Sequence, residues 1–147
     1  MTKKIFLLIL ISMFIGCQDK SNDKKVDFQP ILDSLENDVQ KNLDTGERML
    51  HTSRKYRLES DSLLNVIYSE TLKLRNINSD SLESSQEEFL SKRKKIEDSL
   101  WKQVDSIYEE TGISPELERM TSYGYVGAIN MERASELNKI LKNSNRN

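Results

Sequence analysis

The side chains able to do chemistry are few in this sequence. It contains one histidine, His51, and one cysteine, Cys17, and neither stands among residues at metal-ligand or catalytic spacing. Carboxylates are abundant between residues 83 and 98, but they alternate with lysines at the spacing of a solvated helix face. The sequence also lacks a glycine-rich phosphate loop. We therefore expect a protein that is not an enzyme and uses no cofactor or metal.

The residues before Cys17 indicate that its sulfur could carry a lipid. Lys3 and Lys4 are followed by a run of eleven almost exclusively apolar residues, 5–15. A helix needs about 20 apolar residues to span a bilayer, so the shorter run is typical of a secretory signal. With Gly16 before it, Cys17 resembles the lipobox cysteine of bacterial lipoproteins, whose sulfur carries a diacylglyceryl group. The alternative is a plain secretory signal followed by an incidental cysteine.

These features divide the chain into four parts. They are a signal peptide (1–16), a lipidated Cys17 with a polar tether (17–25), a helical domain (26–142) and a disordered tail (143–147). The tether residues after Cys17 include no apolar side chain, which is typical of a solvated linker. Two acyl chains give stable membrane attachment. We therefore expect a protein of the cell envelope, anchored at the periplasmic face or the outer-membrane surface.

Composition narrows the class of partner and the fold. Without residues 1–16 the chain has 20 basic and 24 acidic residues, a net charge of −4, and no concentrated basic segment for nucleic acid. Cys17 has no partner for a disulfide within the chain, so the fold must depend on packing. The low content of glycine and proline, five and two residues, favours helices.

Apolar residues recur at three- and four-residue spacing, which predicts helices. The expected helices are 29–44, 60–75, 81–110 and 128–142, with a less certain helical turn or two at 47–56. Asp80 and Glu83 indicate a capping box, and Gly112 is expected to end the third helix. The segment Tyr123–Gly127 is expected to be an irregular loop. The sequence predicts an all-α fold, a small helical bundle built on a long antiparallel helical hairpin.

The hairpin consists of the second and third predicted helices, and its short loop sets their register. The pairs expected to lie level are Asp61 with Arg93, Asn65 with Phe89, and Tyr68 with Gln86. Polar side chains on an apolar seam need partners to offset desolvation, which predicts an Asp61–Arg93 ion pair. The network either fixes the register alone or also presents some of its residues to a partner. The third helix is expected to bury Leu90, Trp101 and Tyr108 on one face.

The same residues carry a family resemblance. The segment Leu64-Asn65-Val66-Ile67-Tyr68 with Asp61 before it, the segment from Gln86 through Phe89 to Arg93, and Arg133-Ala134-Ser135-Glu136-Leu137 resemble the ordered motifs of the LprI-type lysozyme-inhibitor family. Phe89 stands where the family has tryptophan, and Lys94 where it has aspartate. The family cysteines are absent, and His51 and Glu97 lie near two of their positions.

The resemblance implies a small secreted helical domain that binds lysozyme-type muramidases, by occlusion rather than chemistry. Tyr123 and Tyr125, on the expected loop, are the candidate partner contacts, and the alternative is that they pack on the bundle. Lysozymes of the common animal type are strongly basic, so an acidic chain would aid encounter. A second hypothesis is a structural or adaptor lipoprotein that docks through the apolar stripe of residues 28–43.

Overall fold

A computed structural model describes residues 26–144, and all regular structure in this part of the chain is helical. The prediction of an all-α fold is confirmed. The helices are α1 (Gln29–Asp44), α2 (Met49–Leu72), α3 (Ser79–Thr111) and α4 (Glu116–Ser144). The predicted signal peptide, Cys17 and tether lie outside the described residues. Asn143 and Ser144, expected in a disordered tail, belong to α4 instead.

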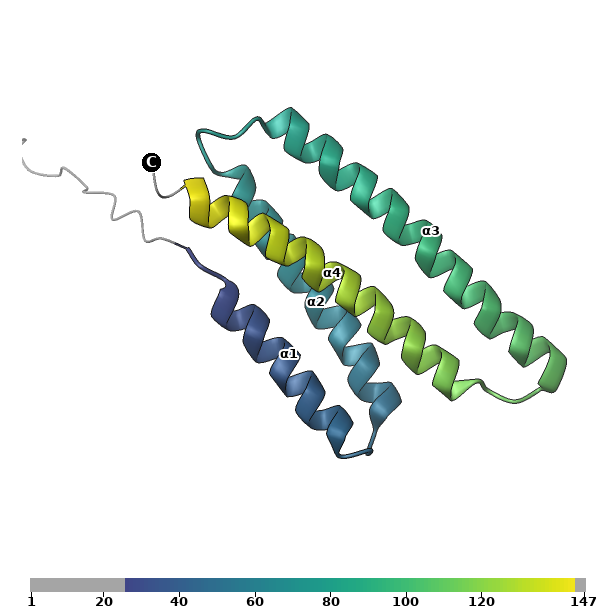
Figure 1. Ribbon diagram of the computed structural model, residues 1–147. Coiled ribbons are helices and arrows are strands. Elements are labelled where there is room, and N and C mark those ends of the chain that lie inside the picture. The colour runs from purple at the N-terminus through teal and green to yellow at the C-terminus, as the bar shows by residue number, and fades with distance from the viewer. Residues whose placement is uncertain (1–25, 145–147) are drawn as a thin grey trace, which may run out of the picture.

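The four helices lie side by side in an elongated bundle (Figure 1). The most extensive contact joins α2 to α4, while α1 packs mainly on α2 and α3 mainly on α4. Helices α2 and α3 are antiparallel, as predicted, but they meet through long side chains rather than by close approach of their backbones. The centre of the bundle is therefore the α2–α4 pair and not the predicted hairpin.

Small residues allow α2 and α4 to approach closely. A Cβ atom added to Gly127 would lie 2.5 Å from Cδ1 of Tyr56 on α2, which is far inside van der Waals contact. Gly127 is buried in the interior of α4. The prediction of an irregular loop at Tyr123–Gly127 was wrong, because this segment is helical and Gly127 serves helix packing rather than a turn. The predicted last helix accordingly begins twelve residues earlier, at Glu116 rather than Ala128.

Helices α2 and α3 begin differently from prediction, and α2 also ends earlier, at Leu72 rather than Arg75. The N-cap of α3 is Asn78, whose Oδ1 accepts a hydrogen bond from the Ser81 backbone N–H at 3.0 Å. Asp80 lies in the first turn of α3, so the predicted capping box was wrong. Residues 49–72 form one continuous helix, which takes in the uncertain segment before Ser60. Gly112 ends α3 with φ +66°, as expected.

The core receives side chains from all four helices and includes the apolar stripe of α1. Phe28 and Leu32 are buried, and Leu35 and Val39 pack against the same core. The remaining buried members come from the other helices: Tyr56, Leu64, Ile67, Leu82, Met131, Ala134, Leu137 and Leu141. The stripe that could have served an adaptor is thus largely covered by the bundle.

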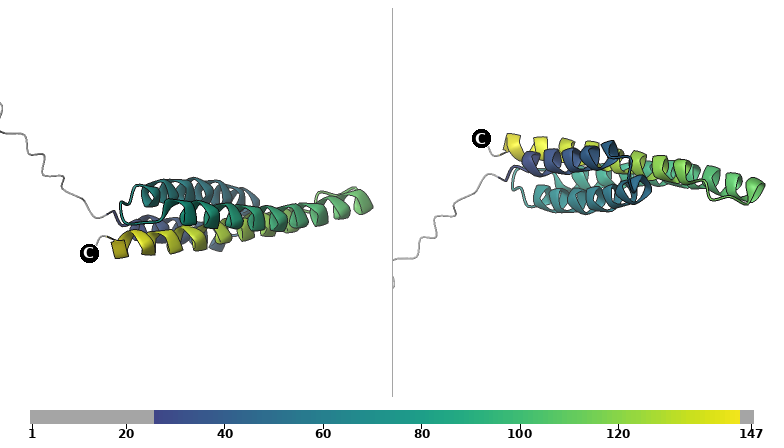
Figure 2. Two further views of the ribbon diagram at one scale, coloured as in Figure 1. Left: turned by 90° about the horizontal axis from the view of Figure 1, so that it is seen from above. Right: turned by 90° about the horizontal axis from the view of Figure 1, so that it is seen from below.

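The ends of α3 and α4 project beyond α1 and α2, as Figure 2 shows. We call residues 101–123 the arm. Trp101 of α3 contacts Tyr123 of α4 edge to face, with ring centroids 5.1 Å apart. Because only two helices form the arm, α3 has no neighbour on its other faces, and Tyr108 is 56% exposed. The predicted burial of Tyr108 was wrong for this reason. The predicted burial of Leu90, which lies outside the arm, was also wrong, since this side chain is 37% exposed.

Candidate functional site

The residues of the family resemblance gather between α2, α3 and α4. Arg93 Nη1 donates to Asp61 Oδ1 at 2.5 Å, which confirms the predicted ion pair, and to Asn130 Oδ1 at 2.8 Å. Asn130 in turn donates through Nδ2 to Ser60 Oγ at 3.3 Å. One arginine of α3 is thereby bonded to both central helices. We call this network, with the Arg133 contacts described next, the polar cluster.

Arg133 of α4 makes the second half of the polar cluster. Its Nε donates to Gln86 Oε1 at 3.1 Å and its Nη2 to Ser85 Oγ at 2.9 Å, both on α3. Its Nη1 also pairs with Glu136 on its own helix at 3.0 Å. The Arg133 side chain is only 12% exposed, and it joins α4 to α3 through these hydrogen bonds.

Phe89 lies between the two arginines. The Cζ of Arg93 is 5.9 Å from the centroid of its ring, and the Cζ of Arg133 is 5.6 Å from it. A guanidinium at this distance from an aromatic ring is attracted by the ring quadrupole. Phe89 therefore contacts one guanidinium from α3 and one from α4.

Asn65 and Tyr68, which were predicted to lie level with Phe89 and Gln86, make none of the hydrogen bonds of the polar cluster. Asn65 is exposed on α2. Tyr68 is half-buried against the core, and partial burial, with the nearby Glu83 carboxylate, raises the pKa of its hydroxyl. Its predicted partner, Gln86, uses its side-chain oxygen to accept from Arg133.

The charged and amide groups of the polar cluster serve as hydrogen-bond partners for one another. Among residues 26–144 no buried side-chain nitrogen or oxygen is left without a hydrogen-bond partner. A parallel contact joins α2 to α3 closer to the arm, where Arg57 Nη2 lies 2.6 Å from Glu97 Oε1. This arrangement holds three helices in register. Glu97 thus links α3 to α2 through an ion pair with Arg57.

The candidate contacts Tyr123 and Tyr125 lie within α4. Tyr123 is half-buried on Trp101, so the alternative prediction, packing on the bundle, holds for this residue. Tyr125 is 53% exposed and remains available to a partner.

Sequence reasoning missed two buried asparagines of α4. Asn130 completes the polar cluster, and Asn138, with no exposed surface, accepts from the Phe28 backbone N–H at 3.0 Å and donates to Asp27 Oδ1 at 3.1 Å. Both lie four residues from Ala134, on the buried face of α4. A polar residue on an apolar stripe was the pattern that could have revealed them.

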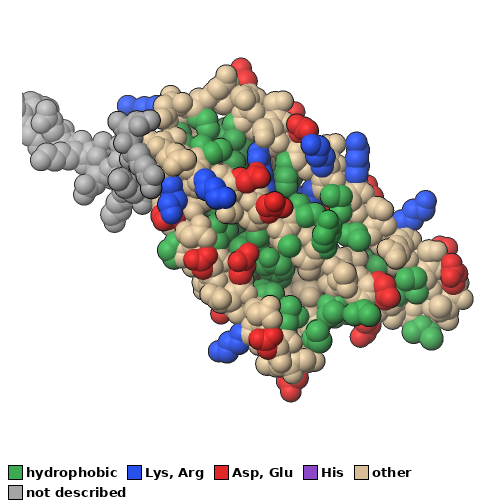
Figure 3. Space-filling view, viewed as in Figure 1, with side chains coloured by type: hydrophobic (Ala, Val, Ile, Leu, Met, Phe, Trp, Pro, Cys, Tyr) green, Lys and Arg blue, Asp and Glu red, His purple; other side chains and the backbone are tan. Residues whose placement is uncertain are grey.

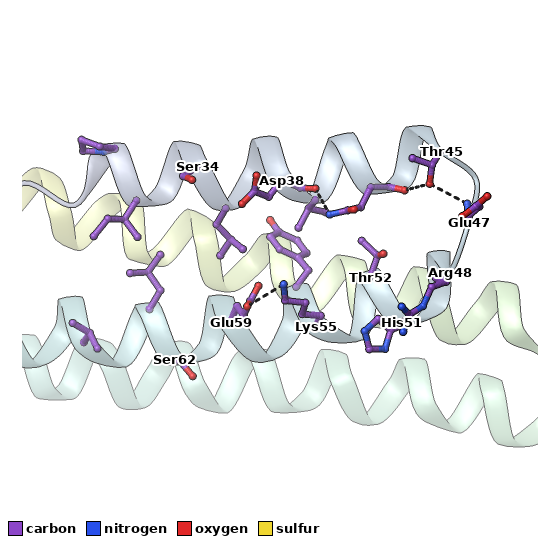
Figure 4. Close-up of a pocket in the computed structure, with 18 residues that line it drawn as sticks. Ser34, Asp38, Thr45, Glu47, Arg48, His51, Thr52, Lys55, Glu59 and Ser62 are labelled. Carbon is purple, nitrogen blue, oxygen red and sulfur yellow. Dashed lines mark hydrogen bonds and ion pairs between the residues drawn. The ribbon is translucent and has the colours of Figure 1, made fainter.

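A groove of about 970 Å³ is lined by residues of α1 and α2 (Figure 4). Its apolar wall includes Leu35, Val39 and Leu63, and burial raises the pKa of the Tyr56 hydroxyl, also in the lining, to about 12. Charges of both signs line it, and Lys55 pairs with Glu59 at 3.5 Å. His51 is exposed near the α1–α2 turn. The part of the chain that the structure describes has no cluster of three metal-ligating side chains.

No family model, curated protein or solved structure matches this chain. None of the described helices is long and apolar enough to cross a membrane.

Proposed function

We propose that this protein is a lipid-anchored lipoprotein of the cell envelope that binds lysozyme-type muramidases and inhibits them by occlusion. The observation that carries the proposal is the polar cluster. Five of the residues on which the family resemblance rests come from three separate helices and lie in one connected network: Asp61 of α2, Gln86, Phe89 and Arg93 of α3, and Arg133 of α4. This contact pattern supports treating the motifs as one structural unit.

Occlusion requires a stable surface and no chemistry of its own. The polar cluster holds α3 and α4 together below the arm, so the arm is presented on a fixed base. A net charge of −4 on residues 17–147 favours encounter with a basic enzyme. Lipid on Cys17 would retain the inhibitor at the envelope, where a muramidase must pass to reach its substrate.

The adaptor hypothesis has less support from the structure. Within the apolar stripe of α1, Phe28 and Leu32 are buried and Leu35 and Val39 pack against the core, whereas Ile31 is 52% exposed. One exposed isoleucine is ordinary for a protein surface.

A lytic assay tests inhibition directly. Hen-type lysozyme is titrated with the full mature chain in mild detergent, while the clearing of a bacterial cell-wall suspension is followed. We expect lytic activity to fall to a low plateau near equimolar inhibitor. Absence of binding at micromolar concentration, measured by calorimetry, would rule out this function.

The lipid anchor has its own test. In a bacterial host with lipoprotein processing, the full-length chain is expected to incorporate labelled fatty acid and to sediment with membranes. The variant Cys17→Ser is the matched control and should do neither. Equal labelling of both chains would show that Cys17 is not the lipid attachment site.

A further inference from the structure

The end of the arm exposes apolar side chains that the bundle does not use. Ile113 in the α3–α4 turn is 71% exposed and Leu117 at the start of α4 is 64% exposed, the two largest values among the exposed large hydrophobic residues described. Single exposed apolar residues need no explanation. These two, however, lie only four residues apart, in and just after the α3–α4 turn, at the most projecting end of the molecule.

The turn between the two helices is well ordered by local hydrogen bonds. Thr111 Oγ1 donates to the Ile107 carbonyl at 2.7 Å and accepts from the Ile113 backbone N–H at 3.1 Å. Pro115 is buried, and Arg119 Nη1 donates to Ser114 Oγ at 3.1 Å. A surface that is already held in one shape loses little conformational entropy on binding.

The same end of the arm is strongly acidic. We call residues 105–119 the tip; they include five carboxylates and one basic residue, Arg119, for a net charge of −4. The whole chain has a net charge of −2, so negative charge is concentrated here. Among residues 26–144, none of the eight ion pairs involves a tip carboxylate. In Figure 3 hydrophobic and acidic side chains lie next to each other at this end of the molecule.

We infer that the tip is the docking element, and that its occupant is a basic protein with an apolar recess. The inference rests on the proposed function, under which that recess is the substrate cleft of the muramidase. Ile113 and Leu117 enter the cleft, and the surrounding carboxylates face the basic surface around it. Apolar anchors ringed by complementary charge are typical of protein interfaces with a small energetic centre. The tip, and not the segment around Tyr123, then makes the principal contact.

Two sets of variants of the full mature chain test the apolar and the electrostatic contributions separately. The pair Ile113→Ser with Leu117→Ser is expected to weaken binding to hen-type lysozyme at least tenfold, mainly through faster dissociation. The matched control, Leu58→Ser with Val66→Ser, changes two side chains of α2 that are 51% and 50% exposed and should leave the Kd unchanged.

The charge variants Glu109→Lys with Glu116→Lys are expected to slow association and to reduce its dependence on salt. Their control, Glu36→Lys with Glu132→Lys, makes the same change in net charge at exposed positions outside the tip and should have a smaller effect. Circular dichroism and the Tm establish that each variant is folded.

The outcomes separate the inference from the function. If the unmodified chain binds lysozyme and the tip variants bind equally well, the tip is not the docking element, although the function stands. The same conclusion follows if the α2 control weakens binding as much as the tip variants. If the unmodified chain does not bind, the proposed function fails and the inference fails with it.

Discussion

Arg93 and Asp61 lie 32 residues apart in the sequence and form an ion pair of 2.5 Å between α3 and α2. The Arg93 side chain is 18% exposed and that of Asp61 is 39% exposed, so the arginine is the more buried partner. The same Nη1 atom also donates a hydrogen bond to Oδ1 of Asn130, a residue that is 1% exposed. The arginine therefore satisfies one carboxylate near solvent and one amide in the core.

This asymmetry sets the cost of removing the arginine. In Arg93→Leu the buried oxygen of Asn130 loses its donor, and we expect the free energy of unfolding to fall by about 1–3 kcal/mol. The double variant Asp61→Leu with Arg93→Leu should recover only part of this loss, since Asn130 remains unsatisfied. Urea unfolding of the single and double variants measures both values. Full recovery in the double variant would show that the Asn130 contact contributes little.

The register of α2 and α3 could be predicted because a short loop between two helices restricts which residues lie level. Asp61 and Arg93 then stood out as opposite charges on an apolar seam. The neighbourhood of α4 could not be predicted in this way, since α4 is joined to α2 only through α3. Arg133 and Asn130 complete the polar cluster through contacts that no local spacing indicates.

The first half of α4 was missed because local and long-range preferences conflict there. Two glycines within four residues, Gly124 and Gly127, favour a loop, since each costs a helix about 1 kcal/mol relative to alanine. The close approach of Tyr56 to Gly127 accounts for one of them. The burial of Tyr108 was predicted wrongly for a different reason. Periodicity reveals which face of a helix is apolar, but it does not reveal whether another helix covers that face.

The two glycines give a matched pair of variants. Gly124→Ala has space, because its new Cβ would meet nothing closer than Ser53 Oγ at 4.0 Å. We expect it to stabilise the protein by about 0.5–1 kcal/mol through helix propensity. Gly127→Ala must displace the buried Tyr56 ring, and overpacking of about 1–3 kcal/mol should exceed that gain. Thermal unfolding ranks the variants; a more stable Gly127→Ala protein would contradict the close α2–α4 packing.

Asn138 fastens the start of α1 to α4. Because its side chain is fully buried and accepts from the Phe28 backbone N–H, Asn138→Ala leaves that group unpaired. We expect a loss of about 1–3 kcal/mol in the free energy of unfolding, together with faster hydrogen exchange of the Phe28 amide, which loses its acceptor. Asn65→Ala is the control, since Asn65 is exposed, and should change stability by less than about 0.5 kcal/mol. Equal effects of the two substitutions would be inconsistent with this role for Asn138.

Asp27 accepts a hydrogen bond from the Asn138 side chain, and its charge makes the attachment of α1 to α4 dependent on pH. The Gln29 backbone N–H, the Asn138 amide and Lys142 together lower the pKa of its carboxyl from 3.8 to about 2. A carboxyl whose pKa is lower in the folded state stabilises the fold above its unfolded pKa, and this contribution is lost as pH falls toward the folded value. The stability advantage of the unmodified protein over Asp27→Asn should therefore be constant above about pH 5 and shrink between about pH 4 and pH 2. Urea unfolding of both proteins across this range measures the difference, and a difference independent of pH would show that the Asp27 charge does not hold α1 in place.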